Sequence, residues 1–177
     1  MAAVAQDQGI VALAAAGDQV AFAQLVRLHQ ADMARVCFVI CGELDIADEA
    51  VEAGWAIAWR KLATLRDHAL VRSWLISIAA NEARQLVRRR GRRRLTEIPM
   101  PLEAGSRDPD PARRAGDLDL ANALARLRPE DRAILALRYL AGFNSTELAA
   151  ATGMSAGGLR ARLARLLDGL RRELGDD

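Results

Sequence analysis

Arginine side chains gather in one short stretch of the chain, residues 84–94. Seven of these eleven residues are arginine and none is acidic. Guanidinium groups at this density bind phosphates, because each brings positive charge and several hydrogen-bond donors. The stretch continues a helical pattern that also presents Asn81, whose amide can read a base edge. Together these residues predict nucleic-acid contact, with a solvated charged helix end or a basic targeting tag as the alternative.

The C-terminal segment has the spacing of a helix-turn-helix. Ala149 is small enough to let two helices approach closely, and Gly153 supplies the backbone freedom of the turn. Apolar Met154 and Leu159 would fill the joint, and Ser155 would cap the second helix. The arginines that lie off the leucine face of this helix are Arg160, Arg162 and Arg165. They could reach guanine edges or phosphates in a major groove; the alternative is an ordinary helical hairpin with a solvated basic face.

Three tryptophans are further candidates for a functional role. Trp55 and Trp59 are one helical turn apart on an apolar face, which predicts that both pack in the core. Trp74 begins the basic-faced helix beside a polar stretch. It could pack internally or stack against separated DNA strands, and the sequence leaves both open.

Cysteine and histidine do not form a recognisable metal site. Cys37 and Cys41 are four residues apart, with His29 two turns earlier, and these three do not complete a tetrahedral zinc site. Buried thiols acting as small apolar groups are expected. No carboxylate pair, nucleophile with its base, or phosphate-binding loop is recognisable. The sequence therefore predicts no metal, no cofactor, no small-molecule substrate and no enzymatic activity.

Composition determines the architecture that must position these residues. Of the 177 residues, 51% are hydrophobic but only 4% are aromatic, so the cores must be aliphatic. Alanine and leucine are strong helix formers, which favours an all-α fold. The net charge is only +2, so the basic stretch is distinguished by its concentration of charge.

Two small helical domains joined by a flexible linker are expected. Helical patterns occupy residues 10–95 and 118–177, whereas 96–117 holds four of the five prolines. Residues 1–9 are expected to be disordered. No basic segment with a following apolar run opens the chain, and no apolar stretch is long enough to cross a bilayer. The lack of both signals, together with only two cysteines, predicts a cytoplasmic protein without membrane insertion.

Polar residues mark the expected helix boundaries. Asp18 is an expected N-cap, and Gly42 ends the helix that follows. Asp45 is the expected N-cap of the next helix, whose acidic first turns suit the positive end of the helix dipole. Pro129 is expected to begin a later helix. On the helix from Trp74 to about Arg90, one side presents Ser77, Asn81, Arg84 and Arg88.

In this order the segments resemble the extracytoplasmic-function sigma factors, the small two-domain group of bacterial sigma-70 relatives. The resemblance runs from about Gly17 to Leu174. It rests on residues 16–22, 45–51 with Trp59-Arg60, 74–83, 127–132 with 137–139, and the helix-turn-helix. It implies a factor that binds core RNA polymerase, directs it to promoters and assists strand opening. Its two domains would be sigma region 2 and sigma region 4.

The resemblance also implies roles for individual residues. The β and β′ subunits of core polymerase would be contacted by Asp45, Asp48, Glu49, Glu52 and Arg60. The −10 element would be contacted by Arg66, Arg72, Trp74, Ser77, Asn81, Arg84 and Arg88, with residues 65–72 capturing an extruded base. The −35 element would be read by Ser155, Arg160, Arg162 and Arg165. An anti-sigma factor is expected as a further partner.

Two segments depart from the pattern of that family. Glu52-Ala53-Gly54-Trp55 replaces a typical Gln-Glu pair followed by Thr or Ala and an aromatic residue, and Gly157-Gly158 replaces a typical Gly-Thr. Two glycines weaken a first helical turn by about 1 kcal/mol each relative to alanine. A weaker or altered −35 contact, or help from a partner, is therefore expected. Two other hypotheses are a stand-alone helix-turn-helix regulator, which would not need residues 45–90, and an adaptor that has lost DNA binding.

Overall fold

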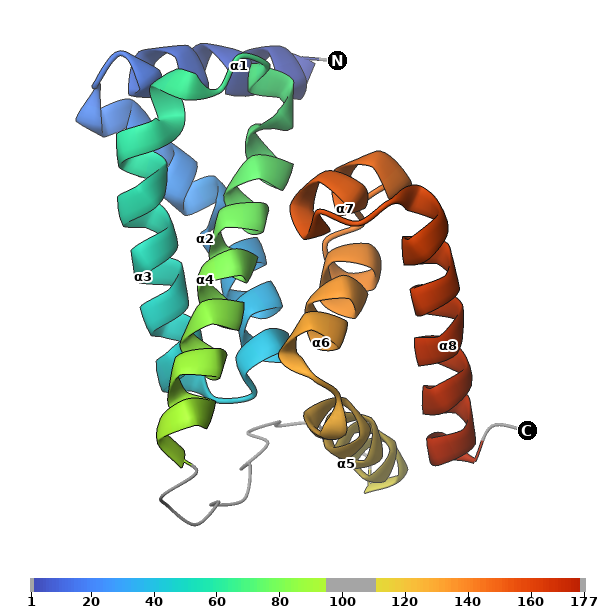
Figure 1. Cartoon of the computed structure of the whole chain (residues 1–177). Helices are drawn as coiled ribbons and strands as arrows, with labels where there is room; N and C mark the ends of the chain where they lie inside the picture. Colours follow the sequence, from blue (N-terminus) through green and yellow to red (C-terminus); the bar gives the residue numbers. More distant parts are fainter. Residues whose placement is uncertain (1, 95–110, 176–177) are drawn as a thin grey trace.

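Every element of regular structure in residues 2–94 and 111–175 is helical (Figure 1). The structure is a computed structural model that describes these residues, with side chains for 8–91 and 119–175. The α-helices are α1 (Ala2–Ala15), α2 (Gln19–Cys41), α3 (Leu44–Lys61), α4 (Val71–Arg94), α5 (Pro111–Arg126), α6 (Pro129–Leu135), α7 (Ser145–Thr152) and α8 (Ala156–Leu174). Two 3₁₀ turns, η1 (Leu62–Thr64) and η2 (His68–Leu70), precede α4, and a π-helical turn, η3 (Ala136–Leu140), follows α6. The all-α prediction is confirmed.

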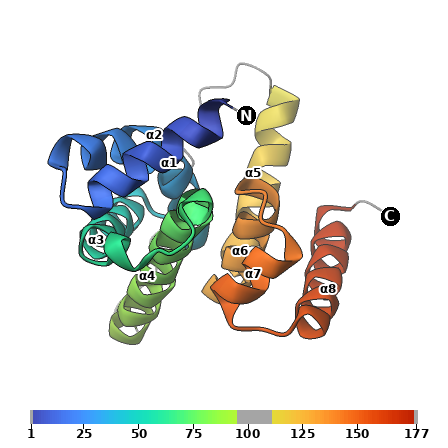
Figure 2. The same ribbon diagram turned by 90° about the horizontal axis from the view of Figure 1, so that it is seen from above.

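Helices α2, α3 and α4 pack side by side, and α1 crosses one end of them over η1 and η2 (Figure 1 and Figure 2). Their aliphatic faces meet in a core in which Leu25, Met33 and Leu75 have no exposed surface. Gly54 lets α3 approach α4 closely, because a Cβ at this position would lie 3.3 Å from the Cα of Ala79. This close packing fixes which side of α4 is left for other contacts.

Local bonds explain where the first helices begin and end. Asp18 caps α2 as predicted, and its Oδ1 accepts the backbone N–H of Val20 at 2.8 Å. Gly42 follows α2 at φ 76°, in the left-handed region. The predicted cap at Asp45 is wrong: Glu43 takes the N-cap position without a side-chain bond, and Asp45 lies in the first turn of α3. Only two residues separate α2 from α3, so the helix begins earlier than the acidic pattern indicates.

Two expected irregular segments are partly helical. The prediction of disorder over residues 1–9 is wrong for 2–9, because α1 begins at Ala2 in an alanine-rich run with high helix propensity. Val11 anchors this helix in the core with no exposed surface. The predicted linker, 96–117, is helical from Pro111, a residue suited to the first position of a helix. The rest of that linker lies outside the described residues.

Two capped helices and a tight turn form the end of the C-terminal unit. Pro129 is the first residue of α6, as predicted. Asn144 caps α7 in a reciprocal capping box with Glu147. Gly153 turns the chain between α7 and α8 at φ 69°, and Ser155 caps α8. The predicted helix-turn-helix is therefore present.

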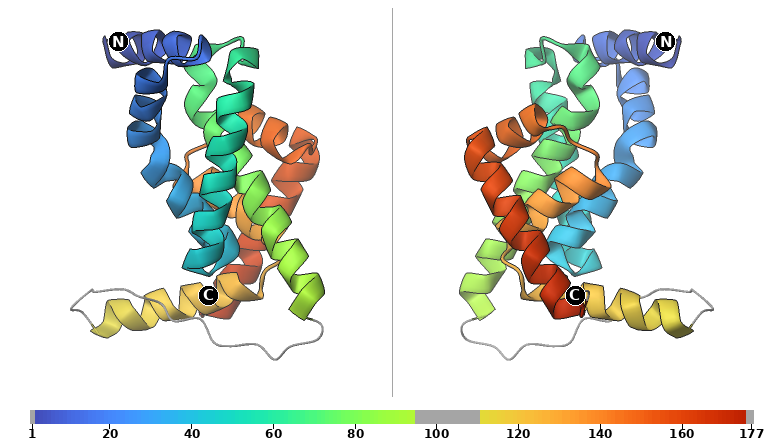
Figure 3. Two further views of the ribbon diagram at one scale, coloured as in Figure 1. Left: turned by 90° about the vertical axis from the view of Figure 1, so that its left-hand side faces the viewer. Right: turned by 90° about the vertical axis from the view of Figure 1, so that its right-hand side faces the viewer.

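The two helical units pack against each other. Both α6 and η3 contact α2, and α6 also contacts α4 (Figure 3). One cluster of buried apolar residues runs across the boundary, with Val36 and Ile76 on one side and Ile134 and Leu137 on the other. The linker prediction alone gave no sign of this shared core.

Candidate nucleic-acid interface

One side of α4 carries the polar residues predicted to meet the −10 element. At 100° per residue, the side chains within about 80° of one another are Trp74, Ser77, Asn81, Arg84 and Arg88. The opposite side faces the helical bundle, and Leu75, Ala79 and Ala83 have no exposed surface there. The structure thus brings these five residues into a single row on α4.

Arginines at both ends of α4 are bonded to the C-terminal unit. Arg88 donates from Nε to Oε1 of Glu130 at 2.6 Å. Arg72 donates from Nη1 to the backbone oxygen of Ala141 at 2.8 Å, and from Nε to Oδ2 of Asp32 at 2.8 Å. The sequence did not predict these contacts, because Glu130 is 42 residues from Arg88 and Ala141 is 69 residues from Arg72.

The middle of the row is partly exposed. Ser77 donates from Oγ to the backbone oxygen of Ser73 at 2.7 Å, and exposed Asn81 accepts from Nη2 of Arg84 at 3.3 Å. Arg84 is half-buried, and its Nε has no hydrogen-bond partner among the described residues. Burial lowers the pKa of Arg84, and the charge of Arg88 lowers it further. Asn81 is thus the member of this stretch best placed to meet a ligand.

The segment 65–72, which runs into the first two residues of α4, is more regular than the predicted loop. Its centre is the 3₁₀ turn η2, which Asp67 caps by accepting a backbone N–H at 3.0 Å. Arg66 is exposed beside this turn, and Trp74 is partly buried against the core. The irregular part is therefore confined to residues 65–67.

Helix α3 exposes an acidic face. The exposed charged residues that fall within about 120° at 100° per residue are Asp45, Asp48, Glu49, Glu52 and Arg60. Glu49 accepts a hydrogen bond from Nη2 of Arg90 on α4 at 3.2 Å. A face of this charge suits a basic partner surface.

Trp59 lies on this acidic face, where the core prediction is wrong. The residue is 41% exposed, and its ring packs edge-on against Phe22 at 4.8 Å between centroids. Trp55 is half-buried and donates from Nε1 to Oε1 of Gln30 at 2.5 Å. The signal was available in the sequence, because helical spacing puts Trp59 between Asp48 and Glu52 around α3.

Helix α8 presents two of its three predicted arginines to solvent. Arg160 and Arg165 are exposed. Arg162 turns inward and donates from Nε to Oδ1 of Asp131 at 2.7 Å, where the Asp131 side chain is only 7% exposed. Arg162 therefore ties α8 to α6 in this structure.

The glycine pair lies in the first turn of α8. A Cβ at Gly157 would meet no atom within 4 Å, whereas a Cβ at Gly158 would lie 3.2 Å from Oγ of Ser155. That Oγ accepts the backbone N–H of Gly158 at 3.2 Å. The cap bond of α8 is therefore present. At both glycines the backbone of the first turn is left uncovered by a side chain.

Cys37 and Cys41 are buried free thiols. Burial raises the pKa of both, that of Cys41 to about 12. Within the described residues, no group of three or more His, Cys, Asp and Glu side chains is placed to hold a metal ion. Nor is any helix there long and apolar enough to span a membrane.

Two family descriptions match the chain. "Sigma-70 region 2" matches residues 25–93, and "Sigma-70, region 4" matches residues 117–168. The first range contains the acidic face of α3 and the row on α4. The second contains Arg160 and Arg165 of α8.

Individual sigma factors are similar over most of the chain. CnrH of Cupriavidus metallidurans is 31% identical, covering 92% of this chain and 94% of CnrH. The ECF RNA polymerase sigma factor SigM of Mycobacterium tuberculosis is 31% identical, covering 96% and 85% respectively. The probable sigma factor RfaY of Xanthomonas campestris is 29% identical, and the chain spans 42% of that longer protein. The solved structure of CnrH with the cytosolic domain of CnrY has a TM-score of 0.71 and 26% identity, covering 97% of this chain and 98% of that one.

Proposed function

Because the chain belongs to the extracytoplasmic-function group of RNA polymerase sigma factors, we propose that three of its helices divide promoter recognition between them. A sigma factor binds core RNA polymerase, directs it to specific promoters and assists strand opening at initiation. The observation that supports the division is the separation of three chemically distinct faces on α3, α4 and α8 (Figure 1). We take the region 2 domain as residues 10–95 and the region 4 domain as 118–177.

The acidic face of α3 is the proposed contact with core polymerase. Its residues Asp45, Asp48, Glu49, Glu52 and Arg60 would steer and orient the β and β′ subunits through charge complementarity. Trp59 adds an exposed aromatic side chain between these charged residues. Tryptophan is enriched at the hot spots of protein interfaces. All six are exposed in this packing, so docking needs no rearrangement of the chain.

The row on α4 is the proposed contact with the −10 element. Asn81 offers an amide to a base edge, and Arg84 and Arg88 offer guanidinium groups to phosphates. Arg66 and Trp74 lie on either side of η2, where an extruded base would stack. Ser77 belongs to the same row, and Arg72, which is bonded to Asp32 and Ala141 at the start of α4, is proposed to contribute a further guanidinium group.

The exposed part of α8 is the proposed −35 reader. Arg160 and Arg165 would reach base edges or phosphates, and the Ser155 hydroxyl at the helix start would approach the backbone. Arg162 supports these contacts from behind, because its bond to Asp131 holds α8 in place. The bare backbone at Gly157 and Gly158 supports a weaker −35 contact than a Gly-Thr pair would give.

An anti-sigma factor is a second proposed partner. CnrH was solved with the cytosolic domain of CnrY, and RpoE from Bartonella quintana was solved with the anti-sigma factor NepR. The fold of this chain matches both, with TM-scores of 0.71 and 0.68. By this likeness, a dedicated protein would hold the chain away from polymerase until a signal releases it.

The proposed action is binding alone, in the cytoplasm. Core polymerase and the promoter meet there, and the chain would contribute contacts to their complex without a reaction, metal or cofactor of its own. Nucleotide chemistry would remain with the polymerase.

Transcription with purified components tests this function. The chain is mixed with core polymerase and a promoter library, and both complex formation and run-off transcripts are measured. Promoter-dependent transcripts are expected, with loss of complex formation in Glu52→Lys and loss of transcripts but not of complex in Asn81→Ala. Absence of both binding and transcripts would contradict the function. Tight operator binding without polymerase would support a stand-alone regulator instead.

A further inference from the structure

The segment between α3 and α4, residues 62–70, has little structure of its own to hold it in place. Its turns η1 and η2 are three residues each, and hydrogen bonds in such turns have poorer geometry than those of an α-helix. Of residues 62–70, all of which the structure describes, only Leu62 is buried. Contacts from neighbouring helices must therefore decide how rigid this segment is.

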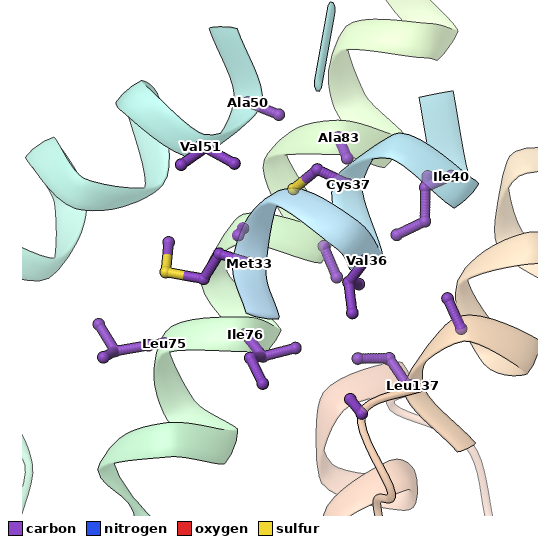
Figure 4. Close-up of a cluster of buried hydrophobic side chains, with 14 of the residues drawn as sticks. Met33, Val36, Cys37, Ile40, Ala50, Val51, Leu75, Ile76, Ala83 and Leu137 are labelled. Carbon is purple, nitrogen blue, oxygen red and sulfur yellow. The ribbon is translucent and has the colours of Figure 1, made fainter. Parts of the chain in front are cut away.

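The main core fixes the two helices that flank this segment. Met33, Val51 and Leu75 lie in the core that α2, α3 and α4 share (Figure 4). All three side chains are at most 1% exposed. This core determines where the segment leaves α3 and enters α4, but none of these side chains belongs to the segment itself.

Helix α1 covers the segment between those two ends. Beyond its neighbour α2, α1 packs on η1 and η2 as it crosses the end of the bundle (Figure 1). Its buried side carries Ile10, Val11 and Ala14, which fall within about 100° of one another around the helix. Val11 has no exposed surface, whereas Leu13, about 160° away from it, is 56% exposed. Burial of one apolar face thus holds α1 and the segment together.

A tight turn joins α1 to α2. The N–H of Gly17 donates to the backbone oxygen of Ala14 at 3.0 Å, and the N–H of Asp18 donates to that of Leu13 at 3.1 Å. These are the two bonds of a Schellman motif. Because Asp18 also caps α2, which runs through the core, α1 is held at a fixed angle over the segment.

We propose that α1 is a positioning element for the captured −10 base, because it holds η2 in the place where Arg66 and Trp74 can enclose that base. This role rests on the base capture proposed above, and it assigns a function to residues 2–15, which lie ahead of both family matches. A site that is already ordered binds its ligand more tightly, since no ordering entropy is lost on binding. Val11 is the positioning residue and acts through the segment, because a side chain without exposed surface cannot touch DNA.

Substitutions at two positions of α1 separate this role from helix formation. Val11→Ala removes two methyl groups from the buried face, and Val11→Asp places a charge there. Leu13→Ala and Leu13→Asp are the matched controls on the exposed face of the same helix. Circular dichroism verifies that each variant keeps its helices, and Val11→Ala carries the test where Val11→Asp unfolds.

The first measurement is hydrogen exchange of the amides of residues 65–70 in the free chain. Each rate is divided by that of the α3 amides, so that a general loss of stability cancels. The normalised rate is expected to rise about fivefold in Val11→Ala, because the segment opens locally when its cover is weakened. The Leu13 variants should match the parent chain. Unchanged exchange in both Val11 variants would overturn the contact between α1 and the segment as its support.

The second measurement is base capture by the complex with core polymerase. The DNA is a promoter obtained from the library, with its −10 element already single-stranded. An abasic residue replaces each non-template position of that element in turn, and the position where affinity falls most marks the captured base. At that position, the ratio of the affinities for intact and abasic DNA is expected to fall about fivefold in Val11→Ala. It should keep the parent value in the Leu13 variants.

The ratio distinguishes positioning from a merely structural role. Both DNAs meet the same protein, so a smaller folded fraction lowers both affinities equally and leaves the ratio unchanged. Faster exchange with an unchanged ratio would therefore overturn the role of α1 in capture, and an equal fall in the Leu13 variants would overturn its assignment to the buried face. Failure of the proposed function is distinguishable, because the parent chain would then show no abasic penalty at any position. The role in capture would fall with it, while the exchange rates would still report whether α1 supports the segment.

Discussion

Arg162 of α8 is joined to Asp131 of α6 by a 2.7 Å hydrogen bond from Nε to Oδ1, and only 7% of the Asp131 side chain is exposed. Arg128 donates to the other carboxylate oxygen at 3.0 Å. The orientation of α8 thus depends on a charge pair that is largely shielded from solvent. Arg162 acts as a positioning residue for Arg160 and Arg165, which lie on the same helix.

Replacing Asp131 by Asn leaves Arg162 without a carboxylate partner. The free energy of unfolding should fall by about 2 kcal/mol, measured by urea unfolding. Asp168→Asn is the matched control, because the Asp168–Arg171 pair on α8 is 65% and 63% exposed. That control should change stability by less than about 0.5 kcal/mol. Equal losses in the two variants would show that the Asp131 bond does not brace the helix.

Acid should destabilise the chain through three paired carboxyl groups. Burial alone raises the pKa of Asp32, Glu130 and Asp131, but the hydrogen bonds and charges of their arginine partners outweigh it and the pKa of each is lowered. The folded state therefore binds fewer protons than the unfolded state near the ordinary values of 3.8 and 4.5. Stability should be constant from pH 7 to about pH 5 and fall below about pH 4. Urea unfolding across this range checks it, and a smaller fall is expected in Asp131→Asn.

Local patterns in the sequence predict the helix caps and the row on α4. Asp18, Gly42 and Ser155 act where expected, because a cap or a left-handed turn depends on residues within three positions. The row follows equally from helical periodicity. The failure at Asp45 is equally local: α3 begins at Leu44, and Glu43 takes the N-cap position without a side-chain bond, so residue preference for the cap did not decide the boundary.

Tertiary contacts decided what the sequence left undetermined. Arg162 and its partner Asp131 are 31 residues apart, and Arg88 and Glu130 are 42 apart. No spacing rule relates such positions, so neither ion pair could be predicted from the sequence. The prediction for Trp59 is wrong for another reason: the spacing of the aromatic residues indicates a buried face, whereas the helical angle of Trp59 is that of the acidic face.

The buried thiols should be inert in the native state. Burial raises the pKa of Cys37 and Cys41 above the ordinary value of 9.0, so both thiols stay protonated and unreactive near neutral pH. The free energy of unfolding falls only as the pH rises above 9.0, where the thiols of the unfolded chain lose their protons. Ellman's reagent at pH 8 should react with neither residue until the chain unfolds. Reaction in guanidinium chloride is the positive control. Rapid native reaction at either cysteine would contradict the burial and leave a redox role open.

The glycine pair should respond unequally to alanine. Gly157→Ala enters open space and should raise the free energy of unfolding by about 1 kcal/mol. Gly158→Ala should gain less, because its Cβ would press on Oγ of Ser155 at 3.2 Å and strain the cap bond. Thermal unfolding of the two variants checks the order. The reverse order would mean that the cap bond is not formed as described.

Trp59 should be an anchor for core polymerase. Truncation to Ala removes an exposed ring from the acidic face of α3 and should weaken binding to core polymerase about tenfold, as expected for a moderate hot spot. Leu120→Ala is the matched control, because Leu120 is 40% exposed but lies on α5, away from that face. Both affinities are measured by fluorescence anisotropy, and thermal unfolding tests whether loss of the Phe22 contact has disturbed the fold. Equal affinities for the two variants would confine the polymerase contact to the charged residues of α3.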